Sequence, residues 1–112
     1  MVNHNPSKAI AQLKPRARDL LEIIRKAAMD SGNVGFSEHA LDRMEERDIT
    51  TMDVLRVLRT GDIVGGIEAG RQAGEWKCKM VARKKGSRDI GVATVVLRSG
   101  RLFLKTVEWE DR

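Results

Sequence analysis

A histidine and two arginines recur at every fourth position of one short segment, FSEHALDRMEERDIT. These residues are His39, Arg43 and Arg47, which would share one face of an α-helix and form a histidine–arginine stripe. An imidazole can transfer a proton, and guanidinium groups can hold a phosphate. The stripe could therefore bind and cleave a phosphodiester. A structural interpretation also fits, in which the histidine packs or caps and the arginines pair with neighbouring carboxylates.

A second group of cations follows from an alternating pattern in the segment EWKCKMVAR. If residues 75–83 form a β-strand, side chains point alternately to its two faces, and three cations share one of them. The three are Lys77, Lys79 and Arg83, and the next turn adds Lys84, Lys85 and Arg88. Such a row can follow a nucleic-acid backbone, because each cation displaces a condensed counterion. The competing interpretation is a solvated sheet face on which lysines prevent aggregation.

The composition describes a basic globular domain. The chain has 112 residues, of which 41% are hydrophobic and 33% are charged, and its net charge is +5 at pH 7. This length suits one domain, and the positive charge favours an acidic partner such as nucleic acid. No apolar run approaches the roughly 18 residues of a membrane span, so we expect a cytoplasmic protein that does not enter a membrane.

The sequence predicts neither a metal site nor a bound cofactor. One cysteine, Cys78, and two histidines are too few for a zinc cluster. The glycines match neither the P-loop nor the dinucleotide-binding pattern. Cys78 falls in the middle of the alternating strand, where a core position is more usual than a nucleophile.

Hydrophobic periodicity divides the chain into a helical first half and a strand-rich second half. Residues 1–15 are expected to form a flexible or helical leader, and residues 16–112 a single domain. Ser37 is placed to cap a helix, as is Thr50 with Asp53 three positions later. The pattern predicts helices over 16–29, 38–46 and 51–59, and strands over 62–68, 75–83, 90–97 and 102–109. The predicted fold is α+β, with the N-terminal helices packed on one face of a C-terminal twisted antiparallel sheet.

The segment around the stripe also resembles a group of known proteins. It is similar to the H-A-x-x-R-M-x-x-R-x-I segment of small bacterial domains that are often encoded beside an antitoxin with a zinc finger. From about residue 16 to residue 110, the order of elements resembles the MqsR toxins. In those toxins a helical half precedes an antiparallel sheet, and the strand comparable to theirs runs here from Trp76 to Arg83.

The resemblance implies a RelE-like microbial ribonuclease fold, with RNA on the sheet face opposite the helices. It implies the toxin half of a type II toxin–antitoxin pair, which cleaves messenger RNA. For such a toxin the mechanism that we expect is metal-free cleavage through the substrate's own 2′-hydroxyl. Its partners would be RNA and a cognate antitoxin of the zinc-finger and helix-turn-helix type. The proton acceptor would be His39, Lys77 or Lys79, the phosphate would be held by Arg43, Arg47 and Arg83, and Lys84, Lys85 and Arg88 would add RNA contacts.

Two departures from the toxin pattern are visible. The chain has no tyrosine, although MqsR-like and RelE-like toxins commonly place one in the RNA site. Lys77 stands where MqsR has a glutamine after the strand tryptophan. Two other functions therefore stay open: a non-catalytic module that only docks nucleic acid, and a protein-interaction domain whose sheet edge accepts a partner strand. A homodimer is compatible with each of them.

Overall fold

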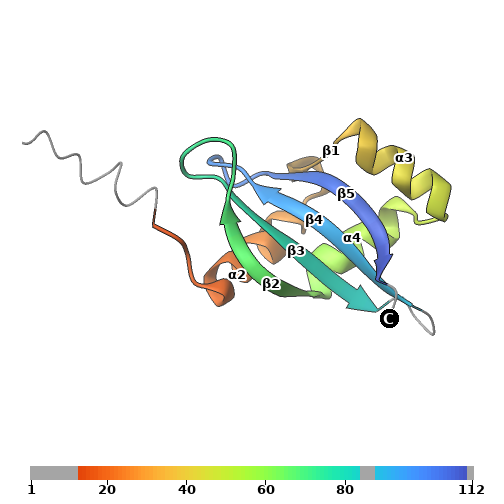
Figure 1. Ribbon diagram of the computed structural model, residues 1–112, viewed down its shortest axis with the longest axis horizontal. Coiled ribbons are helices and arrows are strands. Elements are labelled where there is room, and N and C mark those ends of the chain that lie inside the picture. Colours follow the sequence, from red (N-terminus) through yellow and green to blue (C-terminus); the bar gives the residue numbers. More distant parts are fainter. Residues whose placement is uncertain (1–12, 84–87, 111–112) are drawn as a thin grey trace, which may run out of the picture.

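Helices fill the first half of the described chain and strands fill the second, as the sequence predicts (Figure 1). The structure is a computed structural model that describes residues 13–83 and 88–110. The predicted helices and strands each begin and end within two residues of the observed ones. The elements are α2 (Ala17–Ala27), the 3-10 helix η1 (Ser31–Asn33), β1 (Val34–Phe36), α3 (Glu38–Arg47), α4 (Thr51–Thr60), β2 (Asp62–Ala69), β3 (Trp76–Arg83), β4 (Asp89–Val96) and β5 (Leu102–Glu110).

The five strands form one mixed sheet in the order β1-β5-β4-β3-β2. Neighbouring strands from β5 to β2 are antiparallel, whereas β1 is parallel to β5 and pairs Val34 with Leu102 and Phe36 with Leu104. The prediction of an antiparallel sheet is therefore wrong at this edge. The three-residue β1 strand was missed because it is too short to show an alternating pattern.

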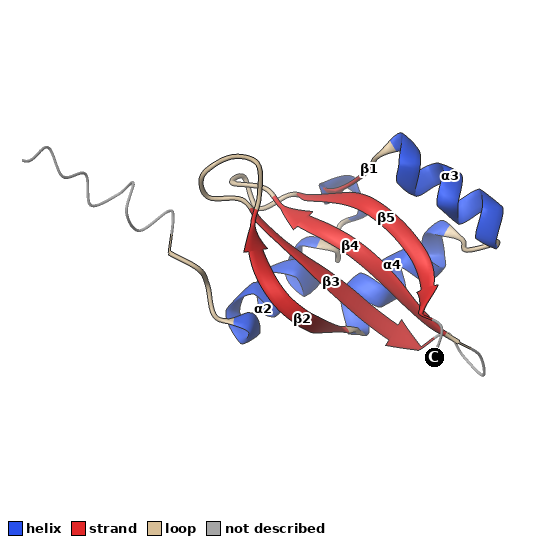
Figure 2. Ribbon diagram, viewed as in Figure 1, coloured by secondary structure: helices blue, strands red, loops and turns tan. Residues whose placement is uncertain are grey.

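Helices α2 and α4 cover one face of this sheet (Figure 2). Leu20 and Ile24 of α2 and Leu58 of α4 are at most 1% exposed and pack in one core with Met80 of β3. Burying a side chain of this size contributes about 1.5–3 kcal/mol, so this layer accounts for much of the stability. The predicted caps of α3 and α4 are confirmed, including the reciprocal capping box of Thr50 and Asp53 at α4.

Helix α4 ends where it crosses β3 at close range. Gly61 follows its last residue, and a Cβ atom at this position would lie 2.6 Å from the carbonyl oxygen of Val81. A larger residue would push the helix away from the strand. The glycine therefore lets the chain pass directly from the helix layer into β2.

Helix α3 lies beside β5 at the edge of the sheet (Figure 1). At its start, the Ser37 hydroxyl accepts a hydrogen bond from Ala40 N and donates one to the carbonyl oxygen of Lys105, each 3.0 Å long. At its end, the indole nitrogen of Trp109 donates to the carbonyl oxygen of Arg47 over 3.0 Å. Both ends of α3 are thus fixed to β5, which determines where the histidine–arginine stripe lies.

The other face of the sheet has no helix over it among the described residues (Figure 2). The alternation predicted for β3 is confirmed: Cys78 and Met80 are buried against the helices, whereas Lys77 is exposed on the opposite face. The β4 residue opposite Lys79 on that open face is the small Ala93. This small side chain lowers the middle of the face relative to the lysine.

Candidate functional site

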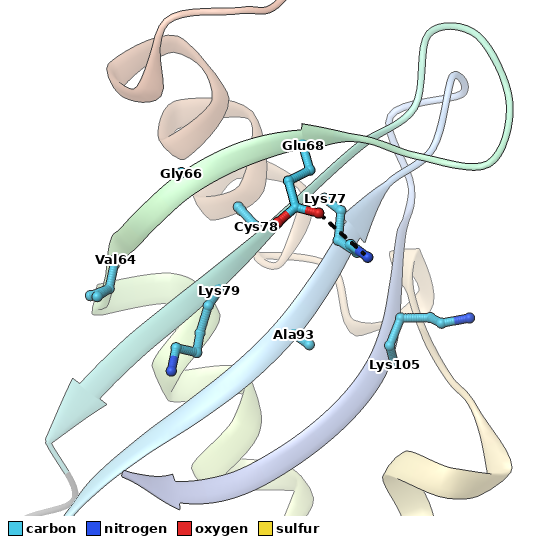
Figure 3. A pocket seen from close by; sticks show the side chains of 8 residues that line it. All are labelled: Val64, Gly66, Glu68, Lys77, Cys78, Lys79, Ala93 and Lys105. Atoms are coloured by element: carbon cyan, nitrogen blue, oxygen red, sulfur yellow. Dashed lines mark ion pairs between the residues drawn. The ribbon is translucent and has the colours of Figure 1, made fainter. Parts of the chain in front are cut away.

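A hollow of about 330 Å³ lies on the open face of the sheet (Figure 3). Three lysines from two strands line it: Lys77 and Lys79 from β3, and Lys105 from β5. Ala93 of β4 lies between them and forms part of the floor (Figure 3). The full lining is Val64, Gly66, Glu68, Lys77, Cys78, Lys79, Ala93 and Lys105.

A second hollow of about 470 Å³ adjoins the first, since Lys77 and Lys105 line both. It adds the aromatic ring of Phe103 and the guanidinium of Arg71, from the loop between β2 and β3. The Lys105 ammonium lies 5.7 Å from the centre of the Phe103 ring, within the range of a cation–π contact. We call the two hollows together the lysine trough.

Two ion pairs position the lysines of β3. Lys79 Nζ lies 2.7 Å from Glu110 Oε1 of β5, so this pair spans the intervening strand β4. The pair passes over Gly91, where a Cβ atom would lie only 2.8 Å from Glu110 Cδ. Lys77 Nζ lies 3.9 Å from Glu68 Oε1, a looser pair in which the glutamate side chain is 73% exposed.

Positive charge predominates around the lysine trough. Four cationic side chains line the two hollows, namely Lys77, Lys79, Lys105 and Arg71, against the two carboxylates Glu68 and Glu75. A surface of this kind attracts a polyanion, and cations held on a rigid sheet lose little freedom when the polyanion binds. The apolar groups between the cations, above all Phe103, suit the flat faces of nucleobases.

The histidine–arginine stripe lies outside this trough. His39 is exposed on α3, and neither hollow has an α3 residue in its lining. Arg43 Nη1 pairs with Glu46 Oε1 at 3.0 Å, and its Nε donates a long 3.5 Å hydrogen bond to His39 Nε2. The structural interpretation, in which arginines pair with nearby carboxylates, thus describes Arg43. The stripe and the β3 lysines do not share one cleft.

The remaining predicted cations lie at the far end of β3 and β4. Arg83 is the last residue of β3 and lies opposite Asp89 in the backbone register of β3 and β4, and Arg88 has its guanidinium 4.7 Å from the centre of the Trp109 ring. Arg88 is in the lining of neither hollow. Lys84 and Lys85 lie outside the described residues.

The trough residues that were missed from the sequence include Glu68, Arg71, Phe103 and Lys105. Alternation in LFLKTVEW places Phe103 and Lys105 opposite the buried Leu102 and Leu104, so their outward direction could have been found. Their closeness to Lys77 could not, because it depends on the order of the strands. A bulge between Ala93 and Thr94 further shifts the register of β4 and β5.

The cysteine next to the lysines faces the core. Burial raises the pKa of the Cys78 thiol to about 11, since the buried site disfavours the thiolate. A neutral, buried thiol fits the predicted core position and is a poor nucleophile. Among the described residues, no group of three or more His, Cys, Asp or Glu side chains is arranged to hold a metal ion. None of the described helices is long and apolar enough to cross a membrane.

Residues 36–109 match the sequence model of a family described as a domain of unknown function, DUF4258. The match covers well over half of the 112 residues, including α3, α4 and the four long strands. The chain belongs to the DUF4258 family. The matched region of this DUF4258 protein contains both the stripe and the trough, whereas α2 precedes it. No curated protein and no solved structure matches the chain significantly.

Proposed function

We propose that this DUF4258 protein is a metal-independent endoribonuclease that holds a single RNA strand in the lysine trough. The observation that carries the proposal is the arrangement of Lys77, Lys79 and Lys105 around one hollow on the open sheet face. The resemblance to MqsR toxins supports the class of reaction, and the α+β order of elements supports a RelE-like fold. In this proposal the protein is the toxin of a bacterial toxin–antitoxin pair.

The trough suits a single strand better than a duplex. Its cations can neutralise phosphates, while Phe103 offers a face on which an unpaired base can stack. Stacking of this kind contributes about 1–3 kcal/mol per base and tolerates different sequences. The bases of a duplex are already stacked on each other, so only the phosphate contacts would remain.

The proposed reaction uses the 2′-hydroxyl of RNA as its nucleophile. Negative charge builds on the phosphate during the attack, and lysines already in position can stabilise it without reorganising. Lys77 and Lys79 each lie within ion-pair distance of a carboxylate that helps to position them, and we assign both a role at the phosphate. DNA lacks the nucleophile and would bind without being cut.

The decisive experiment compares a labelled single-stranded RNA with its all-deoxy counterpart in the presence of EDTA. We expect cleavage of the RNA alone, with 2′,3′-cyclic phosphate ends, and binding of both strands that weakens as salt increases. Salt-sensitive binding without any cut would favour the non-catalytic docking module instead. Absence of both binding and cutting would leave the lysines as a solvated sheet face.

The toxin role predicts a phenotype and a means of control. Expression of the protein should arrest bacterial growth, and Lys77→Ala should relieve the arrest while circular dichroism shows an unchanged fold. A cognate antitoxin would block the enzyme most directly by covering the lysine trough with carboxylates. Growth arrest that persists undiminished in the Lys77→Ala variant would contradict this assignment.

A further inference from the structure

The first hollow contains one carboxylate as well as its three lysines. Glu68 of β2 lines the hollow on one side, and Lys105 of β5 lines it on the other, with Ala93 of β4 between them (Figure 3). Cleavage through a 2′-hydroxyl needs a proton acceptor at the attacking oxygen and a proton donor at the leaving oxygen. Because attack and departure occur in line, these two groups have to lie on opposite sides of the phosphorus.

Glu68 is the carboxylate of this region that is best placed to accept a proton. Its Oε1 lies 3.9 Å from Lys77 Nζ, which is longer than a hydrogen bond. Glu110 is engaged by Lys79 at 2.7 Å and does not line the hollow. Glu75 already accepts a hydrogen bond from Gln72 N at 3.3 Å, within its own loop.

The width of the hollow suits one nucleotide step. Strands β2 and β5 are separated by β3 and β4, so their backbones lie about 14 Å apart at roughly 4.8 Å per strand. Glu68 and Lys105 line the hollow from these two strands, with the Glu68 side chain directed toward Lys77 and the Lys105 ammonium directed away from Ala93 (Figure 3). A phosphodiester over Ala93 would lie between the two strands, and the exposed Lys105 side chain would turn inward to reach it.

We propose that Glu68 is the general base of the reaction and Lys105 the general acid, an inference that rests on the proposed ribonuclease function. The Glu68 carboxylate takes the proton of the 2′-hydroxyl, and that oxygen forms a bond to the adjacent phosphorus. The bond from phosphorus to the 5′-oxygen breaks, and this oxygen takes a proton from the Lys105 ammonium. The products are a 2′,3′-cyclic phosphate and a 5′-hydroxyl, and solvent restores both side chains to their starting protonation states.

Lys77 has a different part in this step. Its ammonium group, which lies 3.9 Å from Glu68 Oε1 in the lining of the hollow, neutralises the phosphate oxygens as the pentacoordinate species forms. In this arrangement Glu68 accepts a proton, Lys77 stabilises the charge on the phosphate, and Lys105 donates a proton. His39 on α3 is not needed for any of them.

The test of the base is Glu68→Gln, with Glu22→Gln as the matched control, since Glu22 is exposed on α2 and lies in the lining of neither hollow. Glu68→Gln should slow RNA cleavage by about 100-fold or more, the usual contribution of general base catalysis. RNA affinity should stay equal or increase, because the substitution removes a negative charge from the trough. The pH–rate profile should lose its acidic limb. Glu22→Gln should cleave within about threefold of the wild-type rate, since this substitution removes a carboxylate outside the trough and leaves the base in place.

The test of the acid uses Lys105→Ala and an RNA whose leaving 5′-oxygen is replaced by sulfur. A thiolate leaves without needing a proton, so the variant should cleave this substrate at close to the wild-type rate, yet cleave ordinary RNA about 100-fold more slowly. A lysine that only held the phosphate would show the same defect with both substrates. Equal defects would therefore overturn the assignment of Lys105.

The inference and the proposed function fail in distinguishable ways. If the wild-type protein cuts RNA and Glu68→Gln cuts it within threefold of that rate, the general base is wrong while the ribonuclease function stands. If Glu68→Gln loses RNA binding together with cleavage, Glu68 is structural and the inference is also overturned. If the wild-type protein cuts no RNA, both the function and its catalytic pair are wrong.

Discussion

Two basic regions of this molecule carry similar charges but are built in different ways. The histidine–arginine stripe lies on one short helix, and its members are adjacent because they recur every fourth residue. The lysine trough brings Lys77 together with Lys105, which lies 28 positions later in the chain, through the pairing of β3, β4 and β5. The first region depends on local spacing and the second on tertiary structure.

The two regions also differ in how their charges are compensated. On α3, Arg43 pairs with Glu46 only three residues away, so an exposed helix face neutralises its own cation. On the sheet, Lys79 pairs with a carboxylate two strands away, whereas Lys105 contacts the ring of Phe103 and forms no ion pair among the described residues. The charge of Lys105 therefore remains available in the trough, which is why we place the RNA there and not on the stripe.

The largest expected effect is on the rate of RNA cleavage, which should distinguish the lysine trough from the histidine–arginine stripe. Lys77→Ala should reduce the rate of RNA cleavage by about 100-fold, because it removes a preorganised charge from the phosphate site. His39→Ala should change the rate by less than about threefold, since His39 lies outside both hollows. Initial rates with a labelled single-stranded RNA provide the comparison. A loss in His39→Ala as large as that in Lys77→Ala would show that α3 contributes to the same site.

The second prediction concerns the glycine under the Lys79–Glu110 pair. Gly91→Ala should lower the free energy of unfolding by about 1–3 kcal/mol, because its methyl group would collide with the Glu110 side chain. The same substitution at Gly66, which has no atom within 4 Å of the added Cβ, is the matched control and should cost less than about 1 kcal/mol. Urea unfolding measures both values.

A double variant sharpens this second prediction. In the Glu110→Ala background the collision partner is absent, so Gly91→Ala should cost less than it does in the wild type, with a coupling of about 0.5–3 kcal/mol. Additive costs would mean that the pair across β4 does not constrain the strand. The Lys79–Glu110 pair would then not hold the β3 lysines of the trough in a rigid position.

The same contrast explains how much could be predicted from the sequence. The α+β class, the caps at Ser37 and Thr50 and the outward direction of Lys77 were predictable, because each depends on residues within one turn or one strand. The parallel pairing of β1 and the closeness of Lys105 to Lys77 were not, because they depend on strand order. The β3 lysines of the trough could therefore be identified from the sequence, whereas the β5 residues beside them could not.

A smaller effect on stability is expected at Ser37, which connects the start of α3 to β5 of the trough. Ser37→Ala should lower the free energy of unfolding by about 1 kcal/mol, the usual cost of losing an N-cap. Here the hydroxyl also donates to the carbonyl oxygen of Lys105. Ser31→Ala, an exposed serine in η1, is the control and should stay within about 0.5 kcal/mol of wild type. If Ser37→Ala also weakens RNA binding severalfold, the placement of α3 matters to the trough after all.

The last expected effect appears only in alkaline solution and compares the two faces of β3. The folded protein holds the pKa of Cys78 at about 11, against 9.0 for an unperturbed thiol, because the side chain is buried. Between these two values the unfolded chain releases a proton that the folded chain retains, so this group reduces stability as the pH rises above 9.0. Cys78→Ala should show a shallower loss of stability over that interval than wild type. Equal pH dependence in the two proteins would mean that the thiol is as open to solvent as the lysines on either side of it.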